Sequence, residues 1–262
     1  MDGTRRKFLK LGGLGVLGAA GMSSFKALAQ QNPDAEVTQP GEMPALTAAR
    51  WAMVVNLGAL DTHHSWDKVF NACRIAHNIP TFDNPKDQIK WIWGEEFGKV
   101  FSDFEQPHLA ERFHHLEVPV LCNHCEKPPC TKVCPTEATW RRESDGIVMM
   151  DWHRCIGCRY CVVACPYGSR SFNWKDPRSG LDEKFTSKYP TRMRGVVEKC
   201  TFCEDRLAHG QMPACVEACE HNELVFGDLE DASSEVRELL RDHLTLRRKP
   251  GLGTQPQVYY IV

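Results

Sequence analysis

The chain has 262 residues, 25% of them charged, with 13 cysteines and a formal net charge of −2 at pH 7. Removing residues 1–29 takes away five basic residues and Asp2, which leaves a formal charge of −6. This acidic balance disfavours nucleic acid as a partner. No segment after residue 29 is apolar enough to form a spanning helix, so we expect the mature chain to be soluble or attached to the membrane peripherally.

The first 29 residues predict an export signal. The run Thr4–Lys10 contains the pair Arg5 and Arg6, and an apolar, glycine-rich stretch, Leu11–Met22, and a small-residue site, Ala27–Ala29, follow it. Paired arginines before such a stretch are typical of twin-arginine export. The stretch is shorter than the ~20 apolar residues of a membrane span, although a retained, uncleaved signal stays open. We therefore expect a periplasmic protein that is exported after folding.

The rest of the chain predicts a polar, proline-rich lead-in at residues 30–48 and a domain at residues 49–262. Short strands, one surface helix and long loops are expected in this domain. The expected elements are a strand at Trp51–Asn56, a hairpin of Thr136–Arg142 and Ile147–Met150 turning at Gly146, a strand at Glu223–Phe226, a helix at Ser233–His243 and an exposed inserted loop near residues 173–194.

Twelve of the thirteen cysteines fall into three blocks. The blocks are Cys122-x2-Cys125-x4-Cys130-x3-Cys134-Pro135, Cys155-x2-Cys158-x2-Cys161-x3-Cys165-Pro166 and Cys200-x2-Cys203-x11-Cys215-x3-Cys219. Two intervening residues let the chain curl so that successive thiolates reach adjacent irons. In the bacterial C-x2-C-x2-C-x3-C-P run the fourth cysteine ligates the other cluster. The spacing therefore predicts [4Fe–4S] clusters and electron transfer.

Two other uses of these cysteines stay open. Zinc sites also use C-x2-C pairs, but each zinc needs two pairs and no Cys-Pro ending. Disulfides fit an exported chain. Cysteines three residues apart are nevertheless poor disulfide partners, because the bridge needs particular Cα separations. Clusters explain the spacing better than either alternative.

Three runs, Val118–Cys125, Cys155–Gly168 and Val197–Cys203, resemble the four-cluster ferredoxin-like subunits of complex iron–sulfur oxidoreductases. That family includes the electron-transfer subunits of dimethyl sulfoxide, polysulfide and tetrathionate reductases. With the export signal and the ending Gly253–Tyr260, the chain looks most like the DsrO-type periplasmic ferredoxins of DsrMKJOP complexes. The resemblance implies an α+β fold, namely a duplicated bacterial-type ferredoxin (4Fe-4S) fold with short strands, helices and long loops.

The resemblance also implies which cysteines share a cluster, because the family pairs its blocks and exchanges the fourth cysteine of each. Three [4Fe–4S] clusters follow, with three ligand sets. Set 1 is Cys122, Cys125, Cys130 and Cys165; set 2 is Cys155, Cys158, Cys161 and Cys134; set 3 is Cys200, Cys203, Cys215 and Cys73.

The chain departs from the family at the first cysteine block, which is expected between residues 60 and 80. Only Cys73 is present there. Counting back by the block's spacing puts His63, Trp66 and Val69 at the other three ligand positions. Tryptophan and valine cannot ligate iron, so we expect this fourth site to be empty.

Cys219 would have been the fourth ligand of the lost cluster. It is followed by Glu220 rather than proline, and we expect it to be an orphan thiol. A rival hypothesis joins His63 or His64 to Cys219 in an unusual cluster, since imidazole replaces thiolate in some cluster types. A zinc site at the same place is a further alternative.

The chain shows no nucleophile–base signature and no flavin or nicotinamide loop, so we expect no catalytic residue. The resemblance implies a one-electron relay between two partners, an NrfD-like integral membrane subunit that exchanges electrons with quinone and a multihaem cytochrome c subunit. They would form a hetero-oligomeric complex of sulfur metabolism. The alternatives are an electron-transfer subunit of a molybdopterin-dependent polysulfide or tetrathionate reductase and, from a different class, a zinc-holding structural module.

Positive charge near a cluster raises its reduction potential, so cations inside the cysteine loops are candidates for this role. Ordinary solvated charges are the equal alternative. The four cations are Lys127, Lys132, Arg154 and Arg159.

Overall fold

Strand β1, Trp51–Asn56, lies inside the largest sheet of the described chain. The computed structural model describes residues 43–58, 65–104, 113, 116–181 and 186–262, all within one unit, Met43–Val262. The expected export signal and residues 30–42 of the lead-in lie outside the described residues. No helix in the described ranges is long and apolar enough to cross a membrane.

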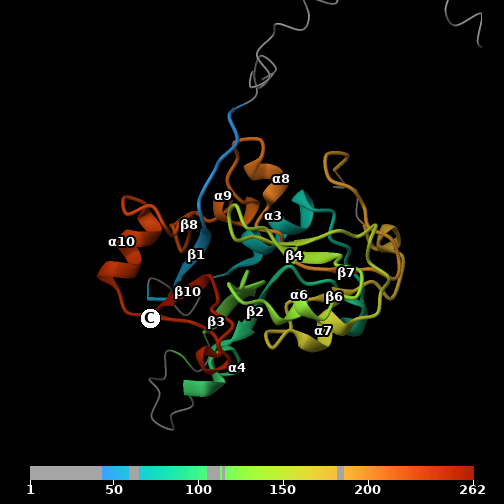
Figure 1. Cartoon of the computed structure of the whole chain (residues 1–262), viewed down its shortest axis with the longest axis horizontal. Coiled ribbons are helices and arrows are strands. Elements are labelled where there is room, and N and C mark those ends of the chain that lie inside the picture. Colours follow the sequence, from blue (N-terminus) through green and yellow to red (C-terminus); the bar gives the residue numbers. More distant parts are fainter. Residues whose placement is uncertain (1–42, 59–64, 105–112, 114–115, 182–185) are drawn as a thin grey trace, which may run out of the picture. The chain divides into compact units, whose positions relative to one another are not determined.

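The described residues form short helices and strands joined by long loops (Figure 1). The strands are β1, β2 (Ile92–Glu96), β3 (Glu117–Leu121), β4 (Thr139–Arg141), β5 (Val148–Met150), β6 (Ser171–Phe172), β7 (Val197–Glu198), β8 (Leu224–Asp228), β9 (Thr245–Leu246) and β10 (Val258–Ile261). The helices are α3 (Asp67–Ala76), α4 (Phe97–Val100), α6 (Pro129–Lys132), α7 (Tyr160–Ala164), α8 (Glu204–Leu207), α9 (Ala214–Glu217) and α10 (Glu235–Asp242).

The main sheet has the order β8-β1-β10-β9, with β1 antiparallel to β8 and parallel to β10. Successive side chains of a strand point to opposite faces. Met53 and Val55 accordingly pack in the main core, whereas Ala52 and Val54 pack in a second core beneath α10. Both faces of β1 are therefore covered, which explains its unbroken apolar sequence.

Helix α10 covers the outer face of this sheet through Val236, which is fully buried. Its N-terminus is capped by Ser234, whose hydroxyl oxygen accepts a hydrogen bond from the Arg237 N–H at 3.3 Å. Glu235 in its first turn and Arg241 in its last turn complement the helix dipole. Figure 1 shows α10, β8 and β1 on one side of the fold and α6, α7, β6 and β7 on the other.

Three two-stranded antiparallel sheets, β2-β3, β4-β5 and β6-β7, complete the pairing found among the described residues. Each of them leads into or out of a cysteine loop: β3 ends just before Cys122, β5 precedes Cys155 and β7 precedes Cys200. The short strands therefore fix the starting points of loops that have little regular structure of their own.

The structure confirms the strand predicted at Trp51–Asn56, the hairpin (β4 and β5) and the strand β8. It also confirms the surface helix, now α10. The expected exposed loop at residues 173–194 is wrong in part, because Asn173, Tyr189 and Arg192 are buried. Arg192 donates hydrogen bonds to backbone carbonyls at the end of α3, so the chain at Arg192 packs onto the body, whereas residues 174–176 and 187–188 are exposed as expected.

Candidate metal centres

The four cysteines of set 1 line one cavity. Cys122 follows β3, Cys130 lies in α6 and Cys165 ends α7. Burial raises the pKa of Cys125 to about 12, and the negative charges of Cys122, Cys130 and Cys165 add to this effect. The four sulfurs of set 1 are therefore close enough for their charges to interact.

The loop that carries Cys122 and Cys125 is held from two sides. The Val148 N–H donates a hydrogen bond to Nδ1 of His124 at 3.0 Å, and this ring stacks on Phe202 with centroids 3.7 Å apart. On the other side, the Gln257 N–H donates to the carbonyl of Asn123 at 2.8 Å. The loop thus contacts β5, the loop of set 3 and the approach to β10.

Three cysteines of set 2, Cys134, Cys155 and Cys161, pack around one small core. Burial raises the pKa of Cys161, and the negative charges of Cys130 and Cys155 contribute to the rise. Burial also raises the pKa of Cys134, but hydrogen bonds from Thr136 and from nearby backbone N–H groups outweigh it and lower the pKa. The fourth member, Cys158, lies in the loop between Cys155 and Cys161 and is half-buried.

Set 3 is the most deeply buried of the three sets. Cys73 comes from α3, which packs against α9, the helix of Cys215. Burial raises the pKa of Cys203, and the charges of Cys215, Cys73 and Cys200 raise it further. Cys73 is thus brought beside three cysteines that lie more than 120 residues away in the sequence.

The chemistry of these sites fits iron–sulfur clusters. All thirteen cysteines, each within the described ranges, carry free thiols. Among the described residues, no three side chains of His, Cys, Asp or Glu are close enough to hold a single metal ion. A zinc ion needs each sulfur about 2.3 Å from one point. Sets of four thiolates are the ligands that [4Fe–4S] clusters require.

Comparison with known proteins agrees with this geometry. A family model described as a 4Fe-4S dicluster domain matches residues 113–180 and 185–229. Iron-sulfur subunit 1 of the Hdr-like menaquinol oxidoreductase of Archaeoglobus fulgidus is 38% identical over 279 residues, covering 98% of this chain and 97% of the relative. The chain belongs to this family of iron–sulfur subunits.

Two further relatives broaden the comparison. The iron-sulfur cluster-binding subunit of the menaquinone reductase of Nitratidesulfovibrio vulgaris is 36% identical, over 81% of this chain and 88% of its own length. A subunit of the tetrathionate reductase of Salmonella typhimurium is 31% identical, over 100% of this chain and 89% of its own length. The iron–sulfur subunit is therefore a ferredoxin-like protein of mixed helix and strand content that binds [4Fe–4S] clusters.

In this iron–sulfur subunit, Cys219 packs against the core that holds Cys73, Cys200 and Cys215, and it has a hydrogen-bond partner of its own. Its thiol donates a hydrogen bond to the Glu223 carboxylate at 2.8 Å. Burial raises the pKa of Cys219, and the bond to Glu223 raises it further. Both effects favour the protonated form of this thiol.

At two of the positions expected for ligands of the first block, the side chains pack in the core. Trp66 and Val69 are buried in the main core, and the Trp66 indole N–H donates to the carbonyl of Glu117 at 3.1 Å. His63 and His64, the rival ligands, lie outside the described residues.

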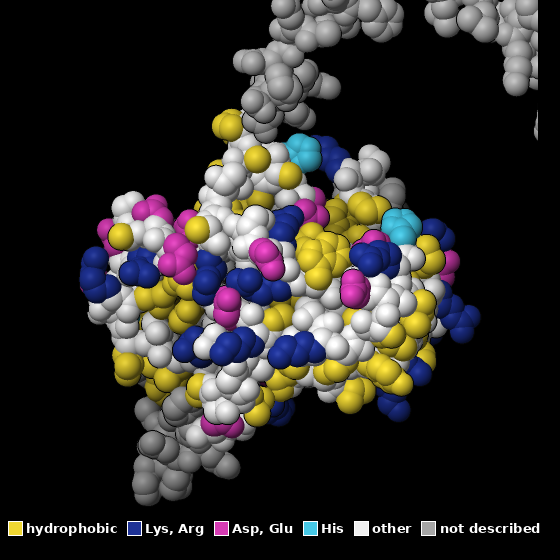
Figure 2. Space-filling model, viewed as in Figure 1, with side chains coloured by type: hydrophobic (Ala, Val, Ile, Leu, Met, Phe, Trp, Pro, Cys, Tyr) yellow, Lys and Arg dark blue, Asp and Glu magenta, His cyan; other side chains and the backbone are white. Residues whose placement is uncertain are grey.

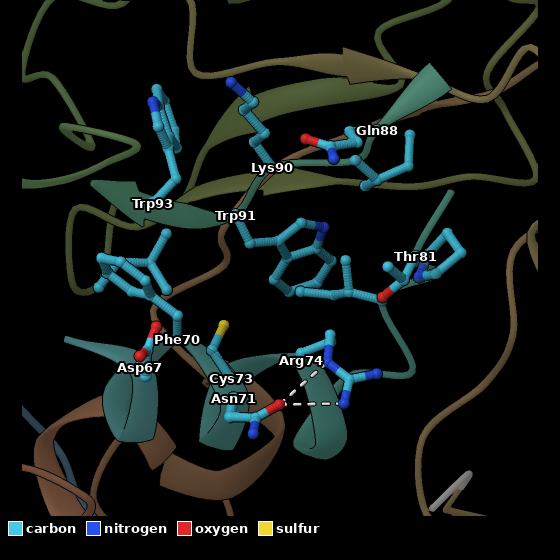
Figure 3. A pocket seen from close by; sticks show the side chains of 14 residues that line it. Asp67, Phe70, Asn71, Cys73, Arg74, Thr81, Gln88, Lys90, Trp91 and Trp93 are labelled. Carbon is cyan, nitrogen blue, oxygen red and sulfur yellow. Dashed lines mark hydrogen bonds between the residues drawn. The ribbon is translucent and has the colours of Figure 1, made fainter. Parts of the chain in front are cut away.

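A surface cleft of about 550 Å³ lies beside Cys73, between α3 and β2. Figure 3 shows Cys73 and Trp91 facing one another inside it, with Lys90 and Trp93 at its upper side. Arg74 at its lower side is fixed by two hydrogen bonds to Asn71, of 2.9 and 3.1 Å. This cleft brings the surface of the protein close to a set 3 cysteine.

The face over set 2 is apolar and exposed. Ile156 is 66% exposed, Tyr160 63% and Val163 86%. In Figure 2, hydrophobic side chains gather at the lower right, over α7, with Lys and Arg at the edge. Set 2 therefore lies beneath an apolar surface, on the side of the fold away from α10.

The four cations that the sequence suggests as neighbours of the clusters lie at the surface. Lys127, Lys132, Arg154 and Arg159 are all exposed, and Arg159 stacks over the rings of Phe172 and Trp174. All four side chains therefore contact solvent, which is consistent with the alternative of ordinary surface charges.

Two other cations, Arg170 and Lys199, are buried beside the cysteines. Nη2 of Arg170 donates to the Cys130 sulfur at 3.0 Å. Nζ of Lys199 donates to the carbonyl of Cys200 at 2.8 Å and to that of Val148. Both follow or precede the cysteine blocks by only a few residues. Their nearness to the cysteine blocks in the sequence could have marked them as candidates. It does not indicate that their side chains are buried.

Proposed function

We propose that this protein is a DsrO-type electron-transfer subunit that relays single electrons through three [4Fe–4S] clusters held by sets 1, 2 and 3. The grouping of the buried cysteines carries this proposal, above all the approach of Cys73 to Cys200, Cys203 and Cys215. The subunit would use a duplicated ferredoxin arrangement of α+β class. It contributes no catalytic residue of its own.

The electrostatic interactions between sets support a linear order. The negative charge of Cys122 in set 1 acts on Cys200 of set 3, and that of Cys130 in set 1 acts on Cys161 of set 2. Set 1 would therefore be the middle station, with set 3 at one end and set 2 at the other. The cleft beside Cys73 and the apolar face over set 2 then mark the two ends of the relay.

When bound, [4Fe–4S] clusters take up and release one electron at a time. The chain holds their thiolate ligands, excludes water and sets the surrounding charge. Main-chain and side-chain donors near Cys134 and Cys130 supply hydrogen bonds to sulfur, which is one of the protein's means of tuning a potential. Burial of set 3 keeps its surroundings apolar, which disfavours added negative charge.

We propose that the partners are an NrfD-like membrane subunit that exchanges electrons with quinone and a multihaem cytochrome c subunit. The protein would be periplasmic, exported folded by the twin-arginine pathway, and held at the membrane by its partners. Its relatives in two quinol or quinone oxidoreductases support this assignment. Residues 30–48 would be a lead-in to the domain at 49–262.

The second candidate is the electron-transfer subunit of a molybdopterin-dependent polysulfide or tetrathionate reductase. The similarity to the tetrathionate reductase relative over the whole chain favours it. The loss of the first block argues against it, because the relay would lack the fourth station of that family.

Affinity purification of the tagged full chain from its own membranes tests the two candidates. We expect c-type haem and a membrane subunit to copurify and a quinol analogue to reduce the clusters. Copurification of a molybdopterin protein without haem would favour the second candidate. A chain that carries zinc and no iron would overturn both.

A further inference from the structure

Arg170 is a buried guanidinium that contacts sulfur. Its Nη2 donates to Cys130 at 3.0 Å and to the Thr139 hydroxyl at 2.8 Å, and its Nη1 donates to the Met150 sulfur at 3.8 Å. Its charge also acts on Cys161. Cys130 belongs to set 1 and Cys161 to set 2, so the guanidinium lies between these two sets.

Lys199 occupies the corresponding position on the other side of set 1. Its Nζ donates to the carbonyl of Cys200, a member of set 3, and to the carbonyl of Val148, a residue that lines the set 1 cavity. Its charge acts on Cys122 as well as Cys200. The ammonium thus lies between sets 1 and 3.

Neither cation has a carboxylate partner within the part of the chain that the structure describes. The buried Arg192, by contrast, forms an ion pair with Glu198 at 2.7 Å. A buried cation is costly unless a nearby negative charge compensates it. A [4Fe–4S] cluster with four thiolates carries about −2 when oxidised, and reduction adds one more negative charge. Clusters bound by the neighbouring sets would supply the negative charge that compensates the buried charges of Arg170 and Lys199.

We propose that Arg170 and Lys199 set the reduction potentials of the relay, Arg170 acting on clusters 1 and 2 and Lys199 on clusters 1 and 3. A positive charge in a low-dielectric interior stabilises the reduced, more negative cluster and so raises its potential. Each cation lies in a gap between two sets, so each also reduces the repulsion between neighbouring clusters that are both reduced. This inference rests on the proposed function, because it needs the three clusters.

The test is a redox titration of the anaerobically purified full chain, followed by EPR and visible absorption. Arg170→Gln is expected to lower the reduction potentials of clusters 1 and 2. Lys199→Met is expected to lower those of clusters 1 and 3. Each shift is expected to reach at least a tenfold change in the one-electron equilibrium, about 59 mV. Arg154→Gln and Lys132→Met, exposed cations of the same loops, are the matched controls and are expected to shift nothing, because water and salt screen them.

The inference is overturned if the buried variants keep the wild-type iron content and potentials, or if the exposed controls shift as much. If Arg170→Gln loses iron, the variant Arg170→Lys, which keeps the positive charge, tests the proposal instead. Retention of iron and potentials in Arg170→Lys supports a role for charge, and loss of both overturns it. A wild-type chain without three reducible clusters is a different result, since it refutes the proposed function before any variant is made.

Discussion

The Cys219 thiol donates a hydrogen bond to the Glu223 carboxylate at 2.8 Å, and Glu223 is itself buried. A thiolate ligand of iron could not make this hydrogen bond. Cys73, by contrast, lies among Cys200, Cys203 and Cys215. The two cysteines therefore differ in their nearest partner. Cys219 has a carboxylate, although its charge also acts on Cys215, whereas Cys73 has three other cysteines.

This contrast predicts opposite results from two matched substitutions. Cys73→Ala is expected to lose or convert one cluster, and Cys219→Ala to keep the full iron content, because only Cys73 contributes a sulfur to a set. Iron and acid-labile sulfide per chain measure both. Loss of iron in Cys219→Ala with none in Cys73→Ala would show that the pairing is wrong.

The Glu223 carboxylate also predicts the reactivity of Cys219. Burial and the bond to Glu223 raise the pKa of Cys219, so the reactive thiolate appears only at a higher pH than for a free cysteine. Glu223→Gln removes the negative charge and lowers this pKa, which increases the thiolate fraction at pH 8. Alkylation of Cys219 by iodoacetamide, followed by mass spectrometry, is expected to be several-fold faster in the variant. An equal or slower rate would contradict the assignment.

The buried ion pair of Arg192 and Glu198 predicts a large effect on stability. Both side chains are fully buried at 2.7 Å, so Glu198→Gln leaves an uncompensated guanidinium. The expected loss is about 3–5 kcal/mol of unfolding free energy, measured by denaturant unfolding under anaerobic conditions. The exposed pair of Lys68 and Glu220, at 2.7 Å, is the control, and Lys68→Met is expected to leave the midpoint unchanged. Equal effects would show that burial does not govern these pairs.

Substitutions at two glycines distinguish the effect of close packing from that of backbone strain. Gly157 and Gly168 both have positive φ, +71° and +65°, but only at Gly157 would a Cβ meet another chain segment, 2.3 Å from the carbonyl oxygen of Gly195. Each alanine is expected to cost about 1–2 kcal/mol in backbone strain. Gly157→Ala is expected also to displace the loop of set 2 and lower its iron occupancy. Similar iron content in the two variants would contradict this.

Much of the local structure was predictable because it depends on short patterns. The apolar run Trp51–Asn56 and the turn at Gly146 predict β1 and the hairpin, since periodicity and turn chemistry are local. The cysteine spacing predicts cluster binding for the same reason, and the dicluster domain match agrees with it.

The electrostatics of the sites could not be predicted in this way. Lys132 and Arg170 are both cations near cysteines, but only Arg170 is buried, because the β4-β5 hairpin and α6 close over it. Likewise, the charged sequence around Arg192 reads as a solvated loop, whereas its partner Glu198 is fully buried. These outcomes depend on contacts between segments far apart in the sequence.

The number of clusters is the central claim, and the iron and acid-labile sulfide content of the anaerobically purified full chain tests it most directly. Three clusters predict about 12 iron atoms per chain, with coupled signals in EPR after dithionite reduction. About 16 would mean that the first site still binds a cluster, with His63 or His64 as a ligand, and would contradict the account.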